Sequence, residues 1–206
     1  MITSLELEQR RSPAALREFV VRLKDAVNAD EHERHCGHLK KGLYKQFLDE
    51  IIPLSRFAIL AYPENYEVQP VLGNQGYDAL VFDALGKEVD RIEITTPHDG
   101  ATEAIDAKLV VSQGIGSVSV YNPGDEIKVL FPHVIKTCLK KALINYSDCT
   151  LVVTISPSPP FESISYLKQY EMQIIMLASE MSGIRFKAKR VFLFVLPDRL
   201  VKVQGL

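Results

Sequence analysis

The chain has 206 residues, of which 47% are hydrophobic, and its 24 basic and 26 acidic side chains leave a net charge of -2. This size and apolar content suffice for one good-sized core, so we expect a single domain over residues 1–206. The balanced charge excludes a protein whose whole surface binds phosphate groups. No apolar run reaches the length of about eighteen residues that predicts a membrane span, so we expect no membrane partner.

Residues 1–30 are predicted to form a helical lead-in. Within them, residues 13–28 place apolar side chains at helical spacing, and Ser12 followed by Pro13 is a typical helix start. A second helix is predicted from about His38 to Ile52, because its apolar residues form one stripe and Pro53 should end it.

The middle of the chain is predicted to consist mainly of strands. Short β-prone runs, separated by Pro, Asn or Gly, occupy residues 57–62, 67–72, 77–83 and 90–97. Residues 110–121, which glycines interrupt, are predicted to be further extended chain.

Helices and strands alternate in the last third of the chain. We predict helices over 127–146 and 161–182, and buried strands over 149–156 and 189–197. Hairpins followed by this alternation predict an α/β protein, a three-layer sandwich whose central mixed β-sheet is flanked by helices.

Two acidic residues interrupt the strands on either side of Gly86. If residues 77–83 and 90–97 form a hairpin with a symmetric turn, facing residues have numbers that sum to 171, which places Asp78 opposite Glu93. Like charges at that spacing destabilise a sheet unless a cation compensates them, and Mg²⁺ is typically held by one or two carboxylates. Thr95 shares the face of Glu93. An asymmetric turn, or a solvated strand face, would leave the acids unrelated.

This region resembles the PD-(D/E)XK nuclease superfamily, which has the restriction-endonuclease-like fold. Asp78 follows Gly76-Tyr77, and Glu93-Ile94-Thr95 stands where the family has (D/E)-x-K. Glu50, in the preceding helix, occupies the place of the acidic helix residue of the family. The expected order of elements over residues 38–197 also matches its α-β-β-β-α-β core.

The resemblance implies that Asp78 and Glu93 hold Mg²⁺ or Mn²⁺, with Glu50 as an accessory ligand, and that the chain hydrolyses phosphodiester bonds in nucleic acid. Thr95 departs from this pattern, because a threonine hydroxyl cannot neutralise developing charge as the lysine of the family does. A lysine from elsewhere would have to substitute, or catalysis is lost while the fold persists.

Three lysines are candidates for that substitution: Lys108, Lys136 and Lys140. The last two, with Gln75, are also candidates for binding substrate. Gln75 could hydrogen-bond a phosphate or a metal-bound water, although residues 74–76 are equally compatible with a turn.

The histidines His32, His35 and His38 recur at every third position and form an alternative metal site, since three imidazoles on one helix arc can converge on a transition metal. Gly37 weakens a helix there, and a solvated helix start explains the same residues.

Local basic clusters leave room for nucleic-acid binding in a chain that is not basic as a whole. They lie at residues 40–45, 136–141 and 185–190. The three cysteines are odd in number and lack close-pair spacing, which is typical of reduced thiols in a cytoplasmic protein. A homo-oligomer, an inactive nuclease-fold binding or assembly protein, and an α/β enzyme acting on a small molecule stay open as alternatives.

Overall fold

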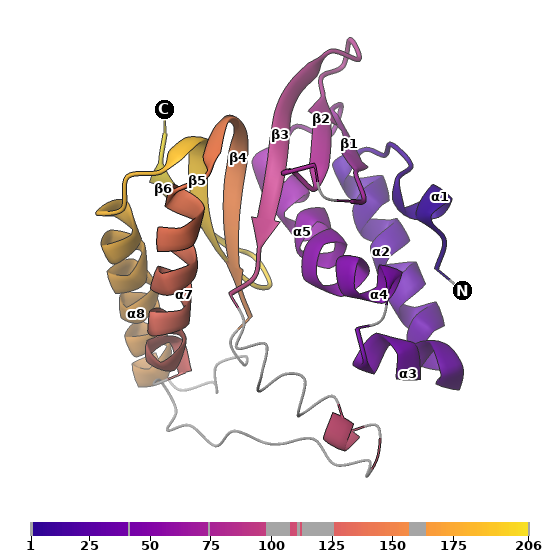
Figure 1. The fold of residues 1–206 in the computed structure, drawn as a ribbon, viewed down its shortest axis with the longest axis horizontal. Helices are drawn as coiled ribbons and strands as arrows, with labels where there is room; N and C mark the ends of the chain where they lie inside the picture. Colours follow the sequence, from indigo (N-terminus) through magenta and orange to yellow (C-terminus); the bar gives the residue numbers. More distant parts are fainter. Residues whose placement is uncertain are drawn as a thin grey trace. The chain divides into compact units, whose positions relative to one another are not determined.

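The computed structural model describes residues 2–40, 42–73, 75–97, 108–110, 112, 126–156 and 164–205, with the backbone alone at 126 and 164–167. The described chain is an α/β protein with two compact units (Figure 1). Unit 1 contains the described residues up to Thr95, together with 108–110 and 112. Unit 2 contains Thr96, Pro97 and the described residues from Glu126 onward. The expectation of a single domain stays a prediction.

Unit 1 begins with helices. They are α1 (Ser4–Leu7), α2 (Pro13–Ala29), α3 (Glu31–His38), α4 (Leu43–Gln46), the π-helical turn η1 (Phe47–Ile51) and α5 (Ile52–Ala61). The predicted start of α2 is confirmed, because Ser12 Oγ accepts a hydrogen bond from the N–H of Ala15 and Pro13 is the first helical residue. Leu16, Phe19 and Val20 are buried on its inner face.

Two expectations for residues 38–62 are wrong. The predicted helix over 38–52 is interrupted, because Lys40 and Gly42 both have positive φ angles between α3 and α4. The predicted strand over 57–62 is instead the end of α5. Pro53 does not end the helix, since the preceding turn is widened and the N–H of Ile52 reaches Phe47 O, five residues back.

The three strands of unit 1 form an antiparallel sheet. They are β1 (Glu67–Pro70), β2 (Ala79–Phe82) and β3 (Glu88–Thr95), with β2 in the middle. This confirms the strands predicted within 67–72, 77–83 and 90–97. The inner face carries Val68, Ala79, Val81 and Ile92, which are fully buried, so the helices and this face share the core of the unit.

Unit 2 consists of α7 (Glu126–Ala142), β4 (Asn145–Ile155), α8 (Ile164–Ser182), β5 (Lys187–Val195) and β6 (Arg199–Gln204). β4 and β5 are parallel and β6 is antiparallel to β5, so the strands of this unit are mixed. The elements expected here are confirmed, although α7 ends at Ala142 and β6 was not predicted. Residues 110 and 112 are helical rather than extended, and the rest of 113–121 lies outside the described residues.

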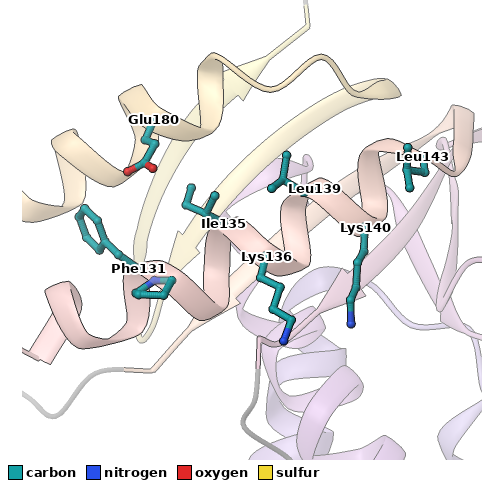
Figure 2. A pocket seen from close by; sticks show the side chains of 8 residues that line it. Phe131, Ile135, Lys136, Leu139, Lys140, Leu143 and Glu180 are labelled. Atoms are coloured by element: carbon teal, nitrogen blue, oxygen red, sulfur yellow. The ribbon is translucent and has the colours of Figure 1, made fainter.

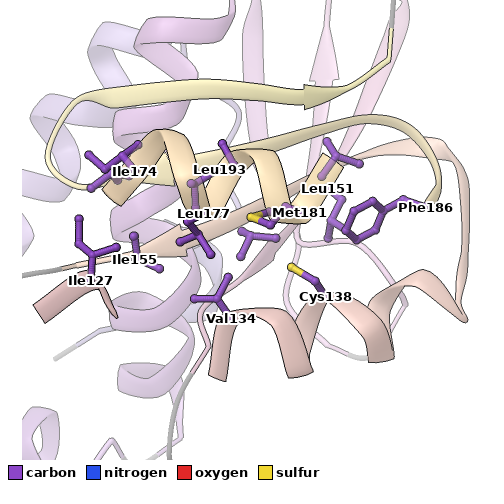
Figure 3. Close-up of a cluster of buried hydrophobic side chains, with 14 residues drawn as sticks. Ile127, Val134, Cys138, Leu151, Ile155, Ile174, Leu177, Met181, Phe186 and Leu193 are labelled. Atoms are coloured by element: carbon purple, nitrogen blue, oxygen red, sulfur yellow. The ribbon is translucent and has the colours of Figure 1, made fainter. Parts of the chain in front are cut away.

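Helix α7 carries two apolar stripes. Its outer stripe includes Ile135 and Leu139 (Figure 2). Its inner stripe, which includes Val134 and Cys138, packs with α8 and with alternate residues of β4 and β5 (Figure 3). Pro132 lies inside α7 without ending it. None of the described helices combines the length and the apolar composition that crossing a membrane requires.

Candidate functional site

The β2–β3 hairpin has the predicted register over its central pairs. Ala79 faces Ile92, Leu80 faces Arg91 and Val81 faces Asp90, so the residue numbers of each pair sum to 171. The turn is not symmetric, because a bulge after Val81 places Phe82 opposite Glu88. Asp78 and Glu93 lie beyond the end of these three pairs, so their direct pairing stays a prediction.

Asp78 lies one residue before β2, next to the last regular pair of the hairpin, Ala79 and Ile92. Its N–H donates to Ile92 O at 2.7 Å, and its carbonyl oxygen accepts from the N–H of Val71 at 2.8 Å. Its carboxylate oxygen Oδ2 accepts from the N–H of Ile94 at 2.6 Å. The Asp78 carboxylate is therefore fixed against β3, beside the residue that follows Glu93.

Glu93 and Thr95 alternate with the core residues of β3 and share the opposite face of the strand. Both are buried, with 8% of Glu93 and 7% of Thr95 exposed. A carboxylate at this depth costs free energy unless it is paired, hydrogen-bonded or bound to a cation. Thr95 is thus a small, buried and uncharged side chain.

Glu50 lies on the π-helical turn η1, which packs against β3. Its side chain is half-buried. Such wide turns inside helices are frequent at functional sites. The sequence-predicted accessory acid is therefore on the helical turn that contacts the strand of Glu93.

Binding of Mg²⁺ or Mn²⁺ by Asp78 and Glu93 stays a prediction. The part of the chain that the structure describes contains no group of three or more His, Cys, Asp or Glu side chains arranged to hold a metal. Two neighbouring carboxylates with water in the remaining positions are nevertheless a usual protein contribution to a Mg²⁺ site. Asp78 and Glu93 are the residues that would hold the ion.

The other predicted substrate ligands are Gln75, which lies three residues before Asp78, and two lysines of unit 2. Gln75 is exposed, and its Nε2 donates to Val71 O and Tyr77 O, so its amide nitrogen braces the loop before β2. Lys136 and Lys140 are exposed on α7 in unit 2. Lys108, a candidate replacement for the motif lysine, is an exposed residue of a short helical segment. Their roles toward a substrate stay predictions.

The histidines His32, His35 and His38 lie on α3. His32 Nε2 is 3.8 Å from Cys36 Sγ, one helical turn away. His32 and His35 also line a pocket with Asp30 and Glu31. The structure thus pairs one histidine with a cysteine, and a zinc site formed by the three histidines stays a prediction.

Two buried hydroxyl–carboxylate pairs in unit 1 escape sequence reasoning. Tyr62 Oη donates to Asp90 Oδ2 at 2.6 Å, and the hydroxyl of Tyr44 bonds Glu33. Burial, followed by the bond to Glu33, raises the pKa of Tyr44 above its ordinary value. The alternation of Asp90 with Ile92 and Ile94 is the one sequence signal, because it places an acid in a row of core residues.

No protein-family model, curated protein or solved structure matches this chain. The case for a site at Asp78 and Glu93 therefore rests on the register, burial and hydrogen bonds of these residues.

Proposed function

We propose that the chain is a metal-dependent, nuclease-type protein in which Asp78 and Glu93 hold Mg²⁺ or Mn²⁺ for the hydrolysis of phosphodiester bonds in nucleic acid. The observation that carries the proposal is the 2.6 Å bond from the Ile94 N–H to Asp78 Oδ2, which fixes the Asp78 carboxylate beside the residue that follows Glu93. The element order supports the resemblance to the restriction-endonuclease-like fold: a helix with Glu50, three antiparallel strands, a helix and a further strand.

The residues of the chain have distinct tasks in this proposal. The bond to the Ile94 N–H orients the Asp78 carboxylate against β3. Glu93 supplies the second negative charge from a buried position, where charge interactions are stronger than in water. A divalent cation held there would polarise a phosphate and lower the pKa of bound water. Glu50 would orient water from η1.

Isosteric neutralisation of each acid tests the proposal. We expect Asp78→Asn and Glu93→Gln each to weaken Mn²⁺ binding, measured by calorimetry, by at least tenfold, and to abolish Mg²⁺-dependent cleavage of single- and double-stranded DNA. Glu88→Gln is the matched control, since Glu88 is an exposed acid of the same strand that pairs with Arg91. Unchanged metal affinity in both variants would refute the paired-carboxylate site.

A second candidate is an inactive nuclease-type fold that binds metal and serves binding or assembly. The observation that favours it is the buried Thr95 at the lysine position. In this case the wild type binds Mn²⁺ and cleaves neither DNA nor RNA. Thr95→Lys should then gain Mg²⁺-dependent cleavage that Asp78→Asn abolishes, whereas Thr95→Val should gain none. Cleavage of DNA or RNA by the wild type, which has Thr95 together with Lys136 and Lys140, would instead favour the active nuclease.

A further inference from the structure

A groove on unit 2 lies over the outer stripe of α7, and it has a volume of about 550 Å³. Its apolar lining comes from Phe131, Ile135, Leu139 and Leu143, and Glu180 of α8 closes one side (Figure 2). The side chains of Leu139 and Leu143 are 54% and 81% exposed. Leu139 and Leu143 therefore line the groove and also protrude from the surface.

Further exposed apolar residues lie on the two helices that border the groove. Among the described residues of unit 2, every exposed large hydrophobic residue lies on α7, on the turn that follows it, or on α8. They are Val129, Leu139, Leu143, Ile144, Met172, Ile175 and Met176. An apolar surface of this kind, rimmed by charges, is typical of a protein interaction site.

The charges at the rims distinguish one occupant from others. Lys136 and Lys140 point to the side of α7 that faces away from α8, whereas Glu180 lies on α8 at the opposite rim (Figure 2). If a second copy of this face is placed on the first by a two-fold axis parallel to α7, each basic rim meets the acidic rim of the other copy. An axis across the helices would instead oppose lysines to lysines.

We propose that the α7–α8 face binds the same face of a second copy of the chain, with the two α7 helices parallel. Leu139 and Leu143 of each copy fill the groove of the other, and Lys136 faces Glu180 across the interface. The contact is isologous, so it closes into a dimer rather than a filament.

The area available sets the strength of this dimer. Helix α7 has 17 residues and is therefore roughly 25 Å long, and two packed helices are about 20 Å wide. The face thus offers on the order of 500 Å² per copy, or about 1,000 Å² in total, which is the lower limit for a specific interface. We therefore expect a reversible dimer that forms at micromolar concentrations.

Sedimentation velocity of the full chain, from roughly 1 to 200 µM, tests the proposal. We expect the wild type to pass from monomer to dimer and Leu139→Asp to stay monomeric. Leu85→Asp is the control, because Leu85 is 93% exposed at the hairpin turn of unit 1 and should leave the dissociation constant unchanged. Circular dichroism melting shows that each variant is folded.

A charge exchange tests the orientation and is independent of any effect of Leu139→Asp on folding. Lys136→Glu and Glu180→Lys should each raise the dissociation constant about tenfold, and the double variant should return it to within a few-fold of the wild-type value. A wild type that is monomeric at 200 µM overturns the proposal and leaves the face to another partner. A double variant weaker than both single variants overturns the parallel arrangement.

Discussion

The strands of the two units differ in the kinds of side chain that they bury. In unit 2, β4 and β5 pack against α7 and α8 through a cluster of apolar residues that includes Leu151, Val153 and Leu193 (Figure 3). In unit 1, β3 is buried on both faces and yet carries Asp90, Glu93 and Thr95 among its buried residues. The first arrangement is what hydrophobic burial alone produces. The second retains costly groups, which is why a binding or catalytic role is sought there.

The largest effect is expected in unit 2. Leu193 is fully buried in β5, so Leu193→Ala should lower the free energy of unfolding by roughly 2–5 kcal/mol through lost burial and the cavity that remains. Urea titration measures this loss. Leu85→Ala, at a 93% exposed position outside the proposed dimer contact, should change it by less than about 0.5 kcal/mol. Equal losses at the two positions would mean that the apolar cluster is not the main source of stability in unit 2.

The next largest change in the free energy of unfolding is expected at a buried hydrogen bond of unit 1. Tyr62→Phe removes the 2.6 Å hydrogen bond to the buried Asp90 carboxylate and should cost about 1–3 kcal/mol, because a buried charged acceptor loses a donor. The same urea titration measures the cost. Tyr66→Phe, at a half-buried tyrosine four residues along, is the matched control and should be close to neutral. A neutral Tyr62→Phe would show that Asp90 does not depend on this hydroxyl.

The sequence predicts unit 2 better than unit 1, and the reason is physical. The apolar stripe of α7 repeats at the helical period, and the short, β-branched and aromatic apolar runs of β4 and β5 are typical of buried strands. Residues 57–62 are as β-prone as a strand, yet they form the end of α5, since Phe57 and Ala58 lie one turn after Leu54 and complete its buried face. In residues 57–61, packing against other elements outweighs the local preference for a strand.

The central register of the hairpin is predictable from the sequence, but the contacts of the candidate site are not. Register arithmetic gives the pairs from Ala79–Ile92 to Val81–Asp90, because the bulge after Val81 offsets the asymmetric turn, and the pairing of Asp78 with Glu93 stays a prediction. The bond from the Ile94 N–H to Asp78 and the burial of Thr95 depend on three-dimensional packing that no spacing encodes. The bulge after Val81 was also missed, since it follows from the conformation of the turn.

A smaller effect is expected at that turn. Asp83 Oδ1 accepts hydrogen bonds from the N–H groups of Leu85 and Lys87, so Asp83→Ala should destabilise unit 1 by about 1 kcal/mol. Chemical denaturation gives the loss, and Mn²⁺ calorimetry on the same variant shows whether the pairing of Asp78 with Glu93 depends on the turn. Lys87→Ala keeps the backbone N–H and is the matched control. A loss of metal binding in both variants would place the determinant outside Asp83.

The smallest effect is a pH dependence that belongs to unit 2 alone. Burial raises the pKa of the Cys138 thiol to about 12. The unfolded thiol ionises near pH 9 while the folded thiol keeps its proton, so unfolding is favoured as the pH rises. The contribution of the protonated thiol to the free energy of unfolding is complete below about pH 8.5 and is lost between about pH 9 and 12. At pH 9.5 the loss should be about 0.8 kcal/mol.

Comparison of variants isolates this contribution of Cys138. Cys138→Ala should unfold with a flatter dependence on pH between 8.5 and about 10.5 than the wild type, whatever constant cost its cavity adds. Cys36→Ala, at a half-buried cysteine of unit 1, should keep the wild-type slope. The raised pKa of Tyr44 is common to all three proteins and cancels in the difference. Equal slopes in the wild type and Cys138→Ala would mean that the thiol reaches solvent, and the apolar cluster of unit 2 would then be open around it.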